Sequence, residues 1–536
     1  MGSMATTTMT VHETTAVYRR PWQEIVAEKR RAQAEAIVAF EKSNGQAVVY
    51  HAIISISDED DIAKVAASIA RGDVSAEKIL FDEAIARARQ LDKHLAQHGT
   101  PVGPLHGIPM TLKDQFDVRG HDSTLGYVGR AGKPAAENAV LVTMLESLGA
   151  VIIAKTNLPQ SIMWSETDNP LWGKTVHPQD ARYTPGGSTG GEAALLSMKG
   201  CSMMGWGTDI GGSIRAPAHM MGLYGFKPSS ARLPYTGVAV STEGQEHVPS
   251  SVGPLARSLA SIEYTMRLFG GQKPWSWDAR CAPLPWRDDM YNGALGRPLT
   301  VGVLYDDEVV RPHPPLTRVL RETVARLRAA GHEVFAWDAS LHADIVAVQD
   351  AFYSADGGED IRRDVALAGE PMIPHVAKLV ERGPAISVYD YWQLNRRKWA
   401  LQQAYLAKWN TTLKSPATEK TADVLIMPPM PHTAVPHGSC RWVGYTKVWN
   451  MVDYPALVLP AGRVCKGDIE AEWAYAPRNE FDAWNAQLWT DNKEDMLGLG
   501  LPVGLQIIGR KLEEERVLAA GKIIDDLFQQ DKKSES

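Results

Sequence analysis

The chain has 536 residues, of which 44% are hydrophobic and 22% charged, and its formal net charge is -7 at pH 7. This composition is typical of a globular protein with a large core, and no tract predicts disorder away from the ends. The acidic excess argues against a nucleic-acid or anionic-membrane surface, since both attract basic faces. No apolar run reaches the roughly 18 residues that a membrane-spanning helix needs.

The N-terminus and the cysteines indicate the compartment. Residues 1–20 begin with Met-Gly-Ser-Met, which we interpret as a cloning remnant, and continue as a polar, Thr-rich stretch. We expect a flexible N-terminus there rather than a secretory signal. The four cysteines are too far apart for a zinc or redox motif and too few for a disulfide scaffold; they are Cys201, Cys281, Cys440 and Cys465. We therefore expect a cytoplasmic protein.

Helical patterns dominate the N-terminal part of the chain. Residues 22–40 have helical composition, and apolar residues recur at helical spacing over 61–70. Ser75 is placed to cap a further helix, which we expect to end near His98 because Gly99 follows it.

Helices and short apolar runs then alternate. A helix is expected over 138–148, ended by Gly149, and a short buried strand over 151–154. The same order returns with a helix over 315–330 and a strand over 333–337. Further strands are expected in four apolar runs, at 299–304, 423–427, 456–460 and 503–508. Such runs are typical of strands covered on both faces by helices, so the predicted fold class is α/β, in one large domain.

Two blocks between Tyr183 and Lys227 are crowded with glycine and hydroxyl residues: Gly-Gly-Ser-Thr-Gly-Gly at 186–191 and Thr-Asp-Ile-Gly-Gly-Ser at 208–213. Glycine lets the backbone turn tightly and brings bare N–H groups close to a ligand. Ser213 follows two glycines and precedes a stretch that can open a helix. Its hydroxyl could therefore lie beside several N–H groups, as an oxyanion hole requires.

Three interpretations of these blocks compete. In the first, the glycines only make turns and the serines only cap helices. In the second, the loop binds phosphate, but neither block has the lysine of a Walker motif, and the glycines at 205 and 207 lack the third glycine of a dinucleotide loop. In the third, a serine is a nucleophile, and it then needs a base to activate it.

No histidine lies in either block, so a lysine is the alternative base. A lysine amine can accept a proton once burial has lowered its pKa enough to leave it neutral. Lys113 is a candidate because it is the single lysine in the stretch 104–114, which carries it on a short apolar run. Taken alone, such a lysine is more often a charge that reaches solvent or an acidic partner.

Three motifs together resemble the amidase signature family. They are Leu112-Lys113-Asp114, the block Gly-Gly-Ser-Thr-Gly-Gly-Glu that begins at Gly186, and the block Gly-Thr-Asp-Ile-Gly-Gly-Ser-Ile-Arg that begins at Gly207. All three stand in the family's order and at about its spacing, and the likeness is closest to the acetamidase-like branch known from fungi. The resemblance implies one amidase-signature domain over 21–536 with a mixed central β-sheet covered by helices. Within it we expect a helical region (21–100), a catalytic core (101–270) and a remainder with insertions (271–536).

The resemblance also assigns roles to individual residues. Ser213 is expected to be the nucleophile, Ser188 the bridging serine after a cis peptide bond from Gly187, and Lys113 the base. The remaining assignments are backbone oxyanion-hole donors at Ile210, Gly211, Gly212 and Ser213; substrate-binding positions at Ile162, Met163, Trp164, Gly187 and Thr189; and support of the nucleophile's loop by Asp209 and Arg215.

Two departures from the family pattern stand out. Thr189 replaces a serine, which keeps a hydroxyl but allows it less movement. Ser213 also follows Ser188 by 25 positions (213 − 188), one more than is usual in the family. We expect the extra residue within 196–204, between the two motifs, where it would lengthen a surface turn.

The resemblance implies an amidase that cleaves the C–N bond of a small carboxylic amide through an acyl-enzyme, with no metal or organic cofactor. A carbamate (urethane) or ester hydrolase on the same three residues is an alternative, and a non-catalytic binding scaffold is an alternative of another class. Five tryptophans either line an aromatic pocket or pack in the core: Trp164, Trp172, Trp206, Trp442 and Trp449. The oligomeric state stays open, a homodimer included.

Overall fold

The computed structural model describes residues 20–44, 60–64, 82–198, 202–411 and 421–535. Most of the helix expected over 61–70, the cap at Ser75 and Cys201 therefore lie outside the described residues. The described α-helices are α1 (Trp22–Asn44), α4 (Asp82–His98), α5 (Val140–Ser147), α6 (Gly190–Ser197), α7 (Arg215–Met221), α8 (Leu259–Gly271), α9 (Asp288–Leu295), α10 (Pro314–Ala329), α11 (His342–Tyr353), α12 (Glu359–Ala366), α13 (Pro374–Val380), α14 (Val388–Thr411), α15 (Gly444–Met451), α16 (Lys466–Glu470), α17 (Glu480–Gly498) and α18 (Glu514–Glu535).

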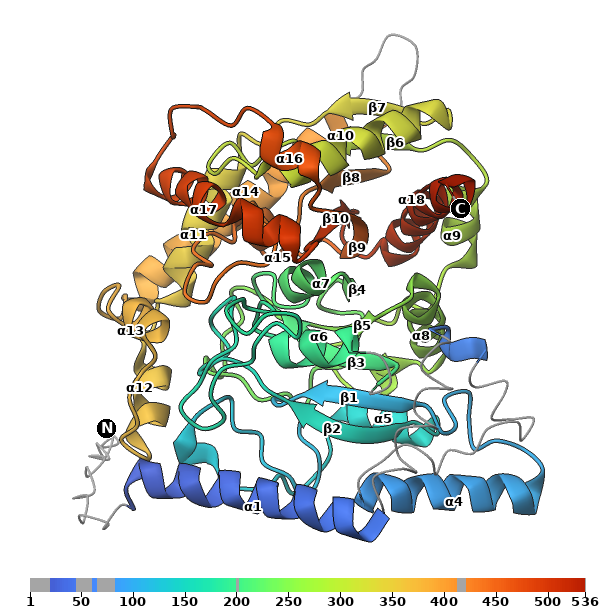
Figure 1. Cartoon of the computed structure of the whole chain (residues 1–536), viewed down its shortest axis with the longest axis vertical. Helices are drawn as coiled ribbons and strands as arrows, with labels where there is room; N and C mark the ends of the chain where they lie inside the picture. The colour runs from blue at the N-terminus through green and yellow to red at the C-terminus, as the bar shows by residue number, and fades with distance from the viewer. Residues whose placement is uncertain (1–19, 45–59, 65–81, 199–201, 412–420, 536) are drawn as a thin grey trace, which may run out of the picture.

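One mixed sheet of ten strands runs through the described part of the molecule (Figure 1). Its strands, in spatial order, are β2 (Val151–Thr156), β1 (Pro109–Lys113), β3 (Met204–Asp209), β5 (Ser251–Ala256), β4 (Tyr224–Lys227), β9 (Ala456–Arg463), β10 (Pro502–Ile508), β8 (Val424–Met427), β6 (Thr300–Val303) and β7 (Glu333–Ala336). The three strands at each end of this order are parallel, and the strands between them are antiparallel.

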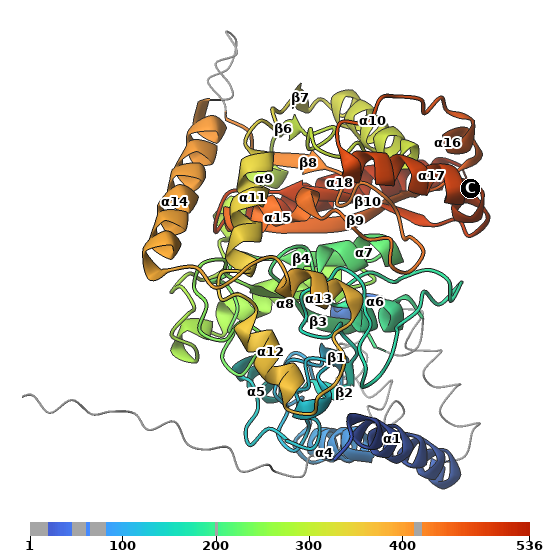
Figure 2. The ribbon, with the colours of Figure 1, turned by 90° about the vertical axis from the view of Figure 1, so that its left-hand side faces the viewer.

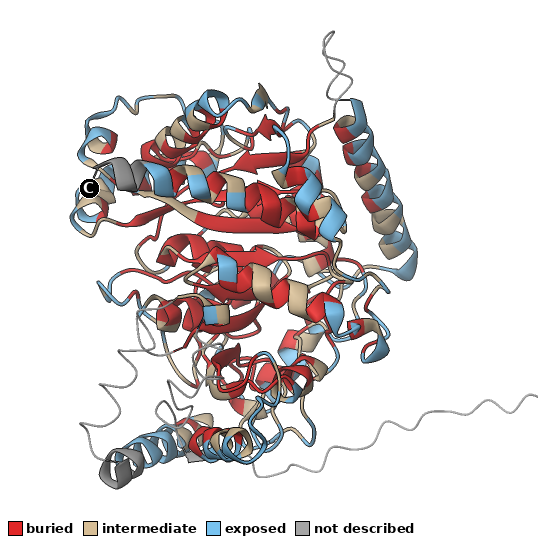
Figure 3. Ribbon diagram, turned by 90° about the vertical axis from the view of Figure 1, so that its right-hand side faces the viewer, coloured by how far each residue is buried: buried red, intermediate tan, exposed pale blue. Residues whose placement is uncertain are grey.

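Helices cover both faces of the sheet, as predicted. On one face, apolar side chains of the strands pack with α5, α8, α9 and α18 in the largest core cluster. On the other face, separate clusters join the strands to α6 and α7, to α11, α14 and α15, and to α17. Figure 3 shows the strands buried between these layers, while α14 lies at the periphery (Figures 2 and 3).

Each continuous apolar run that was expected to be a strand is a strand in the structure. All six expected strands are present, as β2 and β6 to β10. The expectation that β2 is buried is only partly correct, because β2 is an edge strand with half-buried residues between Val151 and Thr156. Gly99 and Gly149 follow α4 and α5 with φ of 68° and 94°, which favours glycine and confirms both predicted helix ends.

Glycines let α6 approach the sheet closely. On β1, Met110 and Leu112 point into the core, so Thr111 and Lys113 point to the opposite face, toward α6. A Cβ on Gly205 of β3 would lie 2.2 Å from the Glu192 carboxylate, and a Cβ on Gly191 of α6 would lie 2.5 Å from backbone N and O atoms of Asn157. These glycines are therefore required for packing as well as for turns.

Substituting Gly191 tests this close approach. Gly191→Ala should lower the free energy of unfolding by roughly 1–3 kcal/mol, because backbone atoms of Asn157 cannot move aside cheaply. Gly293→Ala is the matched control: Gly293 is exposed within α9 and its Cβ would meet nothing within 4 Å. That control should gain roughly 0.5–1 kcal/mol from helix propensity. Urea unfolding of both variants measures the difference, and equal effects would contradict the packing argument.

Candidate active site

The loop from Asp209 to Ser213 joins the end of β3 to the start of α7, and its backbone carbonyls are all hydrogen-bonded. The Asn450 side chain donates to Asp209 O at 3.0 Å, and Tyr353 Oη and Gln349 Nε2 donate to Ile210 O at 2.7 and 3.0 Å. The three remaining carbonyls accept as follows: Gly211 O from Thr446 Oγ1 at 2.6 Å, Gly212 O from Ala216 N at 2.7 Å, and Ser213 O from Thr189 N at 3.1 Å.

The backbone N–H groups of the same loop differ in whether they have a hydrogen-bond acceptor in the protein. Gly212 N donates to Asp209 Oδ1 at 2.8 Å, so this predicted oxyanion donor is already engaged by a carboxylate. Within the described part of the chain, the N–H groups of Ile210, Gly211 and Ser213 have no acceptor at hydrogen-bond distance. Because N–H and C=O of a trans peptide point in opposite directions, holding the carbonyls aims these three N–H groups away from the protein partners.

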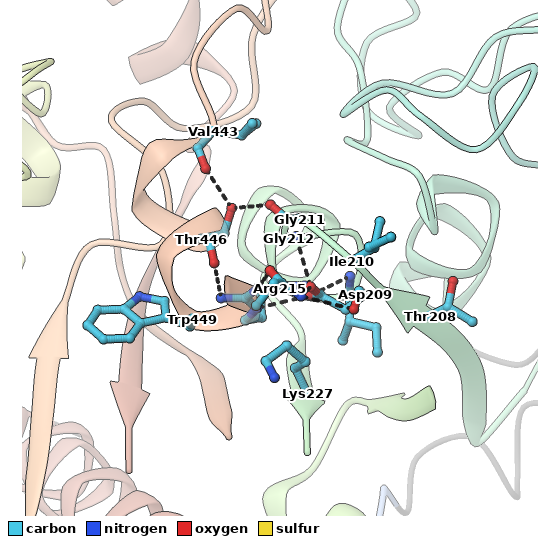
Figure 4. Close-up of polar contacts among 12 residues, drawn as sticks. Thr208, Asp209, Ile210, Gly211, Gly212, Arg215, Lys227, Val443, Thr446 and Trp449 are labelled. Atoms are coloured by element: carbon cyan, nitrogen blue, oxygen red, sulfur yellow. Dashed lines mark hydrogen bonds and ion pairs between the residues drawn. The ribbon is translucent and has the colours of Figure 1, made fainter. Parts of the chain in front are cut away.

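A buried ion pair shapes this loop (Figure 4). Asp209 and Arg215 are both fully buried, and Arg215 Nη2 lies 2.8 Å from Asp209 Oδ1 while Nε lies 2.9 Å from Oδ2. Arg215, with further hydrogen bonds from Asn450, holds the pKa of Asp209 well below its ordinary value against the opposing effect of burial. The Asp209 carboxylate also accepts hydrogen bonds from the backbone N–H groups of Gly212 and Ile214, so the ion pair holds the turn that carries Ser213.

Lys113 and Ser188 meet beneath this loop. Lys113 Nζ donates to Ser188 Oγ at 2.7 Å and to Thr208 Oγ1 at 3.1 Å, and both Lys113 and Ser188 are buried. Burial lowers the pKa of Lys113 to about 7, although nearby carboxylates of Asp209, Glu192 and Asp114 act against this. The peptide bond between Gly187 and Ser188 is cis, as expected.

Glu192 lies in the same buried polar cluster as Lys113. Its carboxylate accepts from Thr111 Oγ1 at 2.5 Å and from Thr156 Oγ1 at 2.8 Å. Burial raises the pKa of Glu192 to about 8, so it is largely uncharged at neutral pH.

A cavity of about 430 Å³ opens in front of the loop. Ser213, Gly187 and the predicted substrate-binding residues Ile162, Met163 and Trp164 line it, together with backbone of 210–212. Thr189 does not line the cavity; it is fully buried behind it, where its hydroxyl donates to Thr208 O at 3.4 Å. Ser188 is likewise buried behind the cavity wall.

A strained turn presents Ile162 to the cavity. Ser161 and Ile162 have φ of 69° and 62°, values that non-glycine residues rarely adopt. Hydrogen bonds from Ser161 N to Leu125 O and from Ile162 N to Pro159 O, both 2.9 Å, hold the turn. Two strained residues in succession are typical of a functional site.

Several residues of the site were missed by sequence reasoning. Tyr353 and Gln349 of α11, and Thr446 and Asn450 of α15, come from segments far along the chain, and no local spacing points to them. Of the five tryptophans considered, Trp164 and Trp442 line the cavity, Trp206 and Trp449 are fully buried, and Trp172 lies elsewhere. Trp484, Phe481 and His375 also line the cavity and add to its aromatic wall.

The family model described as Amidase matches residues 64–518. The chain belongs to this family. "Amidase 1" of Gibberella moniliformis is 51% identical over 529 residues, covering 95% of this chain and all of that protein. "Acetamidase" of Emericella nidulans is 34% identical over 548 residues, covering 95% and 98%. The expected likeness to fungal acetamidases is thereby confirmed, and the chain is a hydrolase that acts on carbon–nitrogen bonds.

Solved structures agree with the family assignment. The structure of "Fatty acid amide hydrolase" superimposes on 96% of this amidase and 91% of its own chain with a TM-score of 0.81 at 28% identity.

In the described ranges, no helix is both long and apolar enough to cross a bilayer. The same ranges contain no group of three or more His, Cys, Asp or Glu side chains placed to hold a metal ion.

Proposed function

We propose that this amidase hydrolyses a small carboxylic amide to the acid and ammonia or an amine, with Ser213 as nucleophile, Ser188 as bridging serine and Lys113 as base. The contact of 2.7 Å between Lys113 Nζ and Ser188 Oγ carries the proposal. A lysine with a pKa near 7 is neutral in much of the protein at pH 7 and above, so it can accept a proton. A binding scaffold does not need a buried lysine with a lowered pKa beside a serine.

In the proposed mechanism the proton moves between Lys113, Ser188 and Ser213. Lys113 takes the proton of Ser188 while Ser188 takes that of Ser213, and Ser213 Oγ attacks the amide carbonyl. The resulting oxyanion is stabilised by backbone N–H groups of the 209–213 loop. The proton returns through Ser188 to the leaving nitrogen, the C–N bond breaks, and water then hydrolyses the acyl-enzyme by the same path.

The cavity suggests the size and character of the substrate. Its volume of about 430 Å³ accommodates more than an acetyl group, and six aromatic side chains line it: Trp164, Tyr353, His375, Trp442, Phe481 and Trp484. Trp164 and His375 stack with ring centroids 4.8 Å apart, and Trp442 and Phe481 are 5.4 Å apart. We therefore propose that amides with an aromatic or similarly flat group are hydrolysed better than acetamide.

Replacing Ser213 tests the nucleophile. Ser213→Ala should reduce kcat/KM for an amide by a factor on the order of 10⁴ or more, since no other hydroxyl replaces the attacking oxygen. A fluorophosphonate should label the wild-type protein once and leave this variant unlabelled by mass spectrometry. Ser197→Ala, at the end of α6, is the control and should be labelled like wild type. Labelling of Ser213→Ala, or its near-normal turnover, would refute the assignment.

The pH dependence tests the base. Below a pH of about 7 Lys113 becomes protonated and cannot accept a proton, so kcat/KM should rise with pH through a midpoint near 7 and then level off. Burial also lowers the pKa of Lys227, to about 8, so Lys227→Met is the matched control. This variant should keep the midpoint of the wild-type profile. A flat wild-type profile between about pH 5 and 9, or a midpoint that is lost in Lys227→Met, would contradict the role of Lys113.

A further inference from the structure

The peptide between Ile210 and Gly211 is held from its carbonyl side by two side chains of one helix. Tyr353 Oη and Gln349 Nε2 both donate to Ile210 O, at 2.7 and 3.0 Å. Gln349 Nε2 also donates to Tyr353 Oη at 2.6 Å, so the two side chains act as one unit. They stand four residues apart on α11 and share one face of it.

The hydrogen bonds to the Ile210 carbonyl also fix the direction of the Gly211 N–H, on the opposite side of the same peptide. The C=O and N–H of a trans peptide are antiparallel, so the direction of Gly211 N–H depends on where Ile210 O is bound. Gly211 lines the cavity, and its N–H has no acceptor among the described residues. A Cβ on Gly211 would lie 2.9 Å from the Tyr353 hydroxyl, which shows how directly that hydroxyl packs on the backbone it holds.

We infer that Tyr353 and Gln349 are positioning residues for the oxyanion: they hold the Ile210–Gly211 peptide so that Gly211 N–H faces the oxygen that becomes negative when Ser213 attacks. The inference rests on the proposed function, since it assumes a tetrahedral adduct on Ser213. Neither side chain touches the reacting atoms. A donor that is already oriented does not have to be turned during the reaction, and this is the source of its effect on rate.

The neighbouring peptide shows why the assignment is to Gly211 and not to Gly212. Thr446 Oγ1 donates to Gly211 O at 2.6 Å, and Gly212 N donates to Asp209 Oδ1 at 2.8 Å. Both ends of the Gly211–Gly212 peptide are therefore bound within the protein. Among the residues that the structure describes, the Ile210–Gly211 peptide is bound only at its carbonyl, which leaves its N–H for a ligand.

Burial raises the pKa of Tyr353 above its ordinary value, so its hydroxyl stays protonated and donating throughout the working pH range. A tyrosine that served only to pack α11 against the loop would affect stability, not the balance between substrate and transition-state binding. The two roles are separable because a positioning role changes kcat and the affinity for a tetrahedral adduct, while KM and thermal stability change little.

Tyr353→Phe, Gln349→Met and the double variant test the inference. The quantities to measure are kcat, KM, Tm and the inhibition constant of phenylboronic acid, which forms a tetrahedral adduct with a nucleophilic serine. Tyr445→Phe is the matched control, because Tyr445 Oη also donates to a backbone carbonyl, Val310 O at 2.6 Å, outside the loop. Its kinetic constants should stay at wild-type values.

We expect kcat to fall on the order of 10-fold in Tyr353→Phe and on the order of 100-fold in the double variant, with phenylboronic acid weakened in proportion and KM changed less than about twofold. Unchanged kcat and inhibition in Tyr353→Phe would overturn the inference, as would a loss matched by Tyr445→Phe. If the double variant does not fold, the kcat and inhibition constants of the two single variants decide whether the inference holds. Failure of the proposed function is distinguishable, since Ser213→Ala would then hydrolyse amide like wild type.

Discussion

The site depends on one constraint: every carbonyl from Asp209 to Ser213 accepts a hydrogen bond from a residue outside the loop. A short glycine-rich loop has many conformations of similar energy, and ordering it costs conformational entropy. Six hydrogen bonds to these five carbonyls and the buried pair of Asp209 and Arg215 offset that cost and select one conformation. As a consequence of this selection, the N–H groups of Ile210, Gly211 and Ser213 meet no acceptor in the part of the chain that the structure describes.

The donors come from three helices and from the residue that precedes a fourth, which explains why the site needs the whole fold. Thr189 precedes α6 and Ala216 lies in α7, both next to the loop in the sheet's covering layer, whereas Tyr353 and Thr446 come from α11 and α15. The segment after β7 thus supplies structural support to the site and also most of the cavity's aromatic wall. Lys113 is placed independently, by the alternation of β1 and by the glycines that let α6 approach.

The sequence predicted those parts of the fold and the site that depend on neighbouring residues in the chain, and it did not predict those that depend on tertiary contacts. Continuous apolar runs predicted β6 to β10, but β3 was missed because Gly205 and Gly207 interrupt its apolar pattern to make room for α6. Lys113, Ser188 and Ser213 were predicted because their motifs are contiguous in the sequence. The engagement of Gly212 N–H by Asp209 and the contacts of Tyr353 were not predictable, because they depend on loop geometry and on tertiary packing that no residue spacing records.

The most direct test of this account is a crystal structure of the protein with phenylboronic acid. We expect the boron bonded to Ser213 Oγ, with one of its oxygens about 2.7–3.1 Å from the nitrogens of Gly211 and Ser213. Tyr353 Oη should still donate to Ile210 O, and Gly212 N to Asp209. An adduct on another residue, or an oxygen that meets no N–H of the 209–213 loop, would contradict it.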